Sequence, residues 1–156
     1  LDERGSTFRG NSASNTSYLA YGKPVLAVAA RRVVAVQDGI REKTPQQAPV
    51  VPITLESAPG NYVLVDVGGG GFALFAHLQP GSLRVQPGDL VSAGMTLGLI
   101  GNSGNSSEPH LHFHLCDDAS PLACEGLPWV LDHFATRAGP RTLEIPMKDA
   151  IVDFDR

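Results

Sequence analysis

The stretch from residue 109 to 115 constrains the fold of this chain most strongly, because histidines and large apolar residues alternate along it. The alternating residues are His110, Leu111, His112, Phe113, His114 and Leu115. Successive side chains of a β-strand point to opposite faces, so the pattern predicts a strand with one apolar face and one imidazole face. Three imidazoles in register favour metal binding or proton transfer. A polar face exposed to solvent is the alternative.

Size and composition predict one globular domain over residues 1–156. The chain is long enough to form its own core, and its 42% hydrophobic and 18% charged residues exclude general disorder. A net charge of -4 and the lack of a Lys/Arg cluster argue against a nucleic-acid partner, because phosphate binding needs a basic face. No apolar segment approaches the ~20 residues of a membrane helix, so we expect no membrane span in this chain.

The first residue of the sequence indicates how the chain was produced. The sequence begins at Leu1 without an initiator Met or a signal segment, which indicates a processed product or a fragment.

Cys116 and Cys124 flank a turn-rich loop. A disulfide between them would indicate an oxidising compartment, and two free thiols in a cytosolic protein are the alternative. Neither belongs to a Cys-x-x-Cys pair, which argues against a thiol redox motif or a thiolate zinc knuckle.

The first third of the chain predicts loops around two short strands. Residues 1–22 are polar and predict a loop. The β-branched runs at 25–29 and 33–36 predict a β-hairpin or one bent strand. Residues 37–52 are rich in Pro, Gln, Lys and Glu without a periodic apolar face, so we expect a long exposed loop.

A glycine run between two apolar segments predicts a β-hairpin in the middle of the chain. Residues 62–67 and 72–78 flank four consecutive glycines, which supply the positive φ angles of a turn. Regular alternation would place His77 on the face of Ala73 and Phe75. A position at the end of a strand suits a functional side chain, although a surface histidine without a role would look the same.

The second half predicts very short strands that turn sharply. Apolar pieces between residues 80 and 101 are punctuated by glycine, as in a small barrel or sandwich. Residues 101–107 favour a tight loop that approaches a ligand, but they lack the Lys and the following helix of a phosphate loop. We expect a short helix over 127–134 and one or two edge strands within 141–154. The predicted fold is therefore a mainly β, antiparallel sandwich or small barrel-like domain with a groove and one short C-terminal helix.

The His-x-His pair lies within a longer ordered series of motifs. Histidines at i and i+2 on a strand lie ~6.5–7 Å apart at Cα and face the same way. The pair follows the glycine- and asparagine-rich segment 101–109, and it is preceded by Phe-Ala-His-Leu at 75–78 and by Val-Gln-Pro-Gly-Asp-Leu-Val-Ser-Ala-Gly at 85–94. This series resembles the lysostaphin-type zinc metallopeptidases, which are endopeptidases that cut peptide cross-links in bacterial peptidoglycan.

The resemblance implies a fold, a metal and roles for the histidines. It covers residues 22–116 as the core, with 1–21 as a loop or the remnant of a truncated N-terminal part and 117–156 as a C-terminal extension. It implies a duplicated hybrid-motif type of β fold and a zinc ion with His112 as a ligand. It further implies that His77 and His110 flank the metal-bound water and the substrate carbonyl, where they position or deprotonate the water and stabilise the oxyanion.

Two departures from the family pattern bear on activity. His114 stands where the family usually has Glu, so it is a candidate auxiliary residue beside the zinc ligand. The upstream His-x-x-x-Asp segment, which supplies the other two ligands, has no counterpart, because residues 1–21 contain no histidine. Truncation, degeneration to a non-catalytic relative, or metal recruitment by the three strand histidines alone would each explain this. Zinc binding and water activation depend on a closed ligand set.

The sequence therefore favours a zinc-dependent peptidoglycan endopeptidase that acts on D-Ala or glycine-containing cross-bridges, in a periplasmic or secreted location and inactive if the ligand set stays incomplete. One alternative is a degenerate module that binds cell-wall peptide or activates an amidase. Another is a histidine phosphocarrier domain, which has a similar glycine-punctuated β architecture and facing histidines but is not favoured by the acidic charge.

Overall fold

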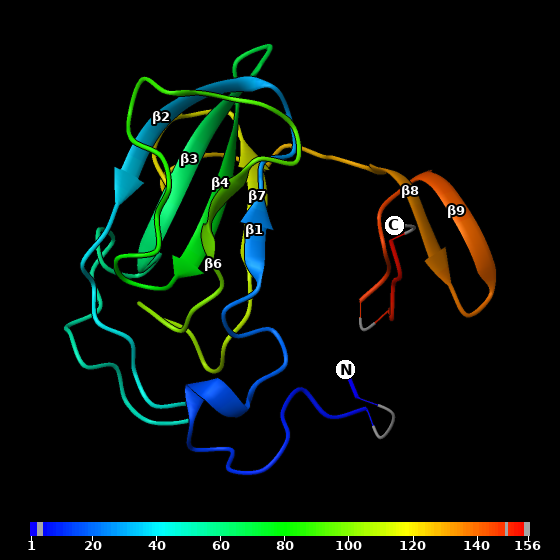
Figure 1. The fold of residues 1–156 in the computed structure, drawn as a ribbon. Coiled ribbons are helices and arrows are strands. Elements are labelled where there is room, and N and C mark those ends of the chain that lie inside the picture. Colours follow the sequence, from blue (N-terminus) through cyan, green and yellow to red (C-terminus); the bar gives the residue numbers. More distant parts are fainter. Residues whose placement is uncertain (3–4, 149, 155–156) are drawn as a thin grey trace. The chain divides into compact units, whose positions relative to one another are not determined.

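The computed structural model describes residues 1–2, 5–148 and 150–154, and it divides the chain into two compact units (Figure 1). The larger unit is Leu1–Gly126 and the smaller is Leu127–Arg156. That both belong to one domain stays a prediction. The described helical structure is a single 3-10 turn, η1 (Asn15–Ser17), and no helix in the described part of the chain has the length and apolar character needed to cross a membrane.

A five-stranded antiparallel sheet forms the centre of the larger unit. Its strands, in spatial order, are β5 (Leu90–Val91), β2 (Arg31–Gln37), β3 (Asn61–Gly68), β4 (Gly71–Leu78) and β7 (His112–Cys116). The glycine-linked hairpin is confirmed as β3 and β4, with Gly68, Gly69 and Gly70 all at positive φ. The sheet ends at β5 and β7 and is not a closed barrel, so the mainly β, antiparallel prediction is confirmed without the barrel-like closure.

A second, two-stranded sheet pairs β1 (Pro24–Leu26) with β6 (Thr96–Leu99). The prediction that 25–29 and 33–36 form a hairpin or one bent strand is therefore wrong, because β1 and β2 belong to different sheets. Ala27 exchanges backbone hydrogen bonds with the turn at Gly94 and Met95. Both runs are short and apolar, and such runs do not reveal whether their partner is adjacent or distant in the sequence.

The main apolar core joins the two sheets. Its fully buried members include Val25 of β1, Leu97 of β6, Val63 of β3 and Phe75 of β4. Burying each of these side chains stabilises the fold by about 1.5–3 kcal/mol. Phe113 of β7 packs on this core, with its ring centroid 5.2 Å from that of Phe75. The predicted apolar face of the histidine strand is thus confirmed.

The smaller unit is a two-stranded antiparallel sheet of β8 (Leu131–Thr136) and β9 (Gly139–Glu144). The predicted short C-terminal helix is wrong, because residues 131–136 pair with 139–144 through a turn at Gly139, whose φ is 111°. Phe134 is buried while His133 is exposed, an alternation that fits a strand. The expected edge strand within 141–154 is confirmed by β9, and Asp153 adds an isolated bridge to Ala135.

Candidate active site

His77 stands at the end of β4 in a left-handed backbone conformation, with φ of 65°. Regular alternation predicts that it shares the face of Ala73 and Phe75. Instead, His77 lines a cavity of about 220 Å³ together with Leu74 and Ala76. The predicted face is therefore wrong, because alternation holds only while each residue keeps extended backbone angles.

Several hydrogen bonds hold His77 in this conformation. Its backbone N–H donates to the Pro59 carbonyl at 3.0 Å, and its own carbonyl accepts from the Gly101 N–H at 3.1 Å. Its ring Nδ1 lies 2.9 Å from the Ser103 carbonyl oxygen. A left-handed residue other than glycine costs roughly 1–2 kcal/mol and persists where its surroundings over-determine it, which happens often at functional sites.

The Ser103 carbonyl also fixes the tautomer of His77. A carbonyl oxygen only accepts hydrogen bonds, so Nδ1 carries the proton and Nε2 of the neutral ring is left as a proton acceptor. Burial, followed by the neighbouring His110, lowers the pKa of His77 from its usual 6.5 to about 4. His77 is therefore neutral at pH 7, and its Nε2 is available to take a proton.

His110 lies directly beside His77, although the two belong to different segments. Their ring centroids are 4.9 Å apart. The Nδ1 atom of His110 donates to the Glu108 carbonyl at 2.8 Å and lies 3.2 Å from the hydroxyl of Ser106. The same argument from the carbonyl acceptor leaves Nε2 of the neutral His110 ring without a proton.

His112 completes the group from the first position of β7. It pairs with Ala76 of β4 across the sheet, and its ring centroid lies 5.8 Å from that of His77. His77 and His112 both line the 220 Å³ cavity. The structure thus brings together the three histidines that the sequence singled out, His77, His110 and His112.

His114 contacts His112 rather than the other two rings. Its Nδ1 lies 2.9 Å from His112 Nε2, so one proton is shared between these two nitrogens. Burial lowers the pKa of both rings, and His114 and His110 lower that of His112 further. A partner on one ring nitrogen orients an imidazole, and the auxiliary role of His114 stays a prediction.

A buried polar network, missed in the sequence, positions the carbonyl that binds His77. The Asn61 N–H donates to Ser103 Oγ at 2.9 Å, and Ser103 Oγ donates to the Leu78 carbonyl at 2.8 Å. Asn61 and Ser103 are both fully buried. Gly60 has φ of +68°, and a Cβ there would lie 2.6 Å from the Ser103 carbonyl oxygen. The available signal was the Gly-Asn pair directly before an apolar strand.

The long loop predicted at 37–52 follows β2, and most of its positions are exposed while the others are buried or half-buried. Residues 46–50 are exposed, whereas Lys43 is 8% exposed. Glu42 accepts hydrogen bonds from the Asn102 backbone at 2.9 Å and from the Tyr21 hydroxyl at 2.8 Å. Burial and then the bond to Glu42 raise the pKa of Tyr21 to about 12. These polar contacts brace the loop that precedes β7, and no apolar periodicity could reveal them.

The site thus consists of three histidines that converge from two segments of an antiparallel β domain. Residues 16–124 match the family described as Peptidase family M23. The chain belongs to this family, and the resemblance found in the sequence is confirmed.

Named relatives agree with this assignment. Over 63 residues the chain is 36% identical to the peptidoglycan DD-endopeptidase ShyA of Vibrio cholerae. These aligned residues make up 40% of this chain and 14% of that protein. A variant of the catalytic domain of the prophage-encoded M23 protein EnpA from Enterococcus faecalis is similar with a TM-score of 0.50 and 22% identity, over 77% of this chain and 84% of that one. LytU gives a TM-score of 0.50 and 20% identity, over 78% of each chain. Both structural likenesses support the fold alone.

The residues around His112 do not provide the ligand set that the family resemblance implies for zinc. A zinc site needs three or four converging nitrogen, oxygen or sulfur donors. Within the described residues, the one group of three such donors that lie within 4.8 Å of one another is His114, Cys116 and Cys124. His112 is not a member of that group. Among the described residues, His112 is therefore the single member of the zinc ligand set that the family resemblance implies.

Proposed function

We propose that this domain is an endopeptidase that hydrolyses peptide cross-links of bacterial peptidoglycan. The observation that supports this most directly is the convergence of the His110 and His112 rings on His77, which lines a cavity together with His112, in a member of family M23. The partial relative named as a peptidoglycan DD-endopeptidase supports the same substrate. Peptidoglycan peptide is then the partner, and an extracytoplasmic location follows from that substrate.

The proposed roles follow from the tautomers of the two neighbouring rings. His77 and His110 each donate from Nδ1 to a backbone carbonyl, which leaves Nε2 to position or deprotonate the attacking water. A ring that has taken a proton can then donate it toward the oxyanion or the leaving amine. Pro59, Leu74 and Ala76 line the cavity and limit the access of other water to the reacting groups.

The metal part of the proposal concerns His112 alone. The family resemblance makes His112 the residue that contacts zinc, and its bond to His114 supports an oriented ring. Because the described residues do not complete a ligand set around His112, we derive no catalytic step through a metal. The zinc content of the purified protein should therefore be measured.

A non-catalytic module that binds cell-wall peptide is the second candidate, and one observation favours it. The cavity and the three rings are in place, whereas the residues that the structure describes do not supply the zinc ligands expected beside His112. Such a module would bind cross-linked peptide without turnover. Activation of an amidase would be one use of that binding.

Release of dye-labelled fragments from purified peptidoglycan, with and without added Zn²⁺, tests the catalytic proposal. We expect His77→Ala and His110→Ala each to reduce the rate by about 10²–10⁴-fold, the usual contribution of an acid–base group. His133→Ala is the matched control, because His133 is exposed in the other unit. Peptide binding without release by the parent chain would support the non-catalytic module instead.

A further inference from the structure

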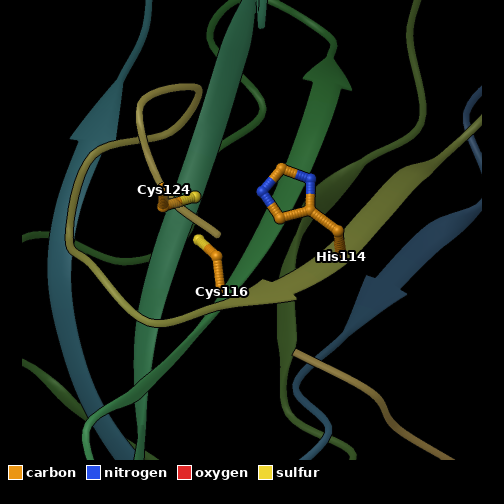
Figure 2. A group of neighbouring side chains, drawn as sticks. All are labelled: His114, Cys116 and Cys124. Atoms are coloured by element: carbon orange, nitrogen blue, oxygen red, sulfur yellow. The ribbon is translucent and has the colours of Figure 1, made fainter. Parts of the chain in front are cut away.

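Two cysteines and one histidine form a cluster beside the proposed active site. Residues i and i+2 of a strand share a face, so β7 presents His114 and Cys116 together. The loop after β7 returns Cys124 to the same place, and the three donor atoms all lie within 4.8 Å of one another. Figure 2 shows the two sulfur atoms close together, with one nitrogen of the His114 ring turned toward them.

The Nε2 atom of His114 is buried and has no hydrogen-bond partner. The other ring nitrogen, Nδ1, is occupied by His112 at 2.9 Å. A buried polar atom without a partner destabilises the folded state, so an unpartnered nitrogen next to two thiols indicates a ligand that would satisfy it. This orphaned atom is the observation that points to a metal ion rather than to the thiols alone.

Backbone hydrogen bonds close the loop that holds Cys124 without a bond between the sulfurs. The Asp117 N–H donates to the Glu125 carbonyl at 3.2 Å, and the Glu125 N–H donates to the Asp117 side chain at 2.9 Å. Cys116 itself forms an isolated bridge with Gly126. Both cysteines are free thiols in this structure. The position of Cys124 therefore does not depend on a disulfide.

We propose that His114 Nε2, Cys116 Sγ and Cys124 Sγ bind a thiophilic metal ion of the Zn²⁺ class. Two thiolates and one imidazole are ligands that such ions prefer. Ligand atoms of tetrahedral zinc lie roughly 3.5–4 Å apart, given Zn–S bonds of ~2.3 Å and Zn–N bonds of ~2.0 Å. The donor atoms of the cluster all lie within 4.8 Å of one another, close to that spacing.

The surroundings leave room for a fourth ligand. A cavity of about 250 Å³ is lined by the three proposed ligands together with His112, Pro121, Leu122 and Gly126. Three protein ligands with one open position are usual where a zinc ion binds water or another small donor. The site therefore fits a metal that remains accessible to a small ligand.

Metal binding at this site displaces the protons of both thiols. On binding, each thiol releases one proton to solvent and becomes a thiolate, and no electron is transferred. Neutral His114 binds through Nε2 and keeps its proton on Nδ1, so that Nδ1 donates to His112 Nε2. The metal would in this way make His112 Nε2 the acceptor of this hydrogen bond and keep the His112 proton on Nδ1. A chain with this cluster loaded would therefore not bind a second ion through His112 at the same time.

Titration of the metal-free, reduced full chain with Co²⁺, followed by competition with Zn²⁺, tests the site. Thiolate ligation gives a sulfur-to-cobalt absorption band in the ultraviolet, which a site made of histidines alone does not give. We expect this band to saturate at one ion per chain and to be displaced by Zn²⁺. His110→Ala is the matched control and should keep the band, because His110 is not a proposed ligand.

Cys124→Ser and His114→Gln should each weaken the affinity by at least 10-fold and reduce or shift the band. Cys124 is only partly buried, so its replacement is milder than that of the buried Cys116, and circular dichroism of each variant checks that the fold is kept. A reduced parent chain without a sulfur-to-cobalt band would overturn the proposal. So would a Cys116–Cys124 disulfide in the purified protein whose reduction fails to produce metal binding. Neither result depends on peptidase activity.

Discussion

At the scale of single residues, the backbone angle of His77 decides what the site can do. Its left-handed φ turns the ring out of the alternation of β4 and into the cavity of Leu74 and Ala76. Sequence patterns identified His77 as a candidate but placed it on the wrong face, because a pattern with a period of two contains no information about one irregular angle. The buried Asn61 and Ser103 were missed for a related reason. They contribute to the site through hydrogen bonds, which a periodic pattern does not reveal.

His77 should make the stability of the metal-free protein depend on pH. Its pKa is about 4 in the folded chain and 6.5 as the usual value, so protonation favours the unfolded state. The stabilisation is fully present above pH 6.5 and is lost as the pH falls through 4. The shift corresponds to about 3 kcal/mol.

Urea unfolding of the parent and of His77→Gln, in the presence of a chelator, measures this effect. Between neutral pH and a pH below 4, the parent should lose about 3 kcal/mol more unfolding free energy than His77→Gln does. His133→Gln, at an exposed position, should follow the parent. Parallel curves for His77→Gln and the parent would show that His77 is not buried in its neutral form.

Gly60 should tolerate no side chain, for a reason that goes beyond its positive φ. A Cβ at Gly60 would lie 2.6 Å from the Ser103 carbonyl oxygen, whereas a Cβ at Gly70, with φ of +82°, meets nothing within 4 Å. We expect Gly70→Ala to cost about 1 kcal/mol from φ strain alone. Gly60→Ala should cost at least about 2–3 kcal/mol and also reduce turnover, because it displaces the acceptor of His77. If Gly60→Ala and Gly70→Ala lowered stability equally and lowered turnover equally, the role given to Gly60 would be contradicted.

At the scale of elements, the β3 and β4 hairpin and the histidine strand were predictable, because each is a run with clear turns or clear alternation. The partner of β1 and the nature of residues 131–136 were not. Short apolar runs fit several pairings, and Pro128 suits the start of a helix as well as the approach to a strand. The pairing of β8 with β9 satisfies backbone groups that a lone short helix would leave without partners.

The segment at 40–45 should be fixed to the sheet by Asn61. The Asn61 side chain accepts a hydrogen bond from the Ile40 N–H at 2.8 Å, and it donates to the carbonyls of Ile40 at 2.8 Å and Leu78 at 3.0 Å. Asn61→Ala should destabilise the fold by about 2–4 kcal/mol and speed amide exchange at Ile40. Gln37→Ala, which removes one exposed bond to Asp38, is the control. Unchanged exchange at Ile40 in Asn61→Ala would argue against this anchor.

At the scale of the whole molecule, the family and the three converging histidines were predictable from ordered motifs. The cluster of His114, Cys116 and Cys124 was not, because the spacing of the two cysteines matches no common metal motif and the loop after β7 had to be folded first. The chain spans 14% of the curated relative it matches, so the activity of the domain has to be measured on this chain directly.

The central claim is that the rings of His77 and His110 act together on a peptide bond of the cell wall. Mass spectrometry of fragments from peptidoglycan digested by the chain, with Zn²⁺ supplied, tests it most directly. The account predicts that cross-linked peptide dimers disappear in favour of monomers, and that His77→Ala stops this change while His133→Ala does not. Dimers that persist with the parent chain, or that disappear equally with His77→Ala, would contradict it.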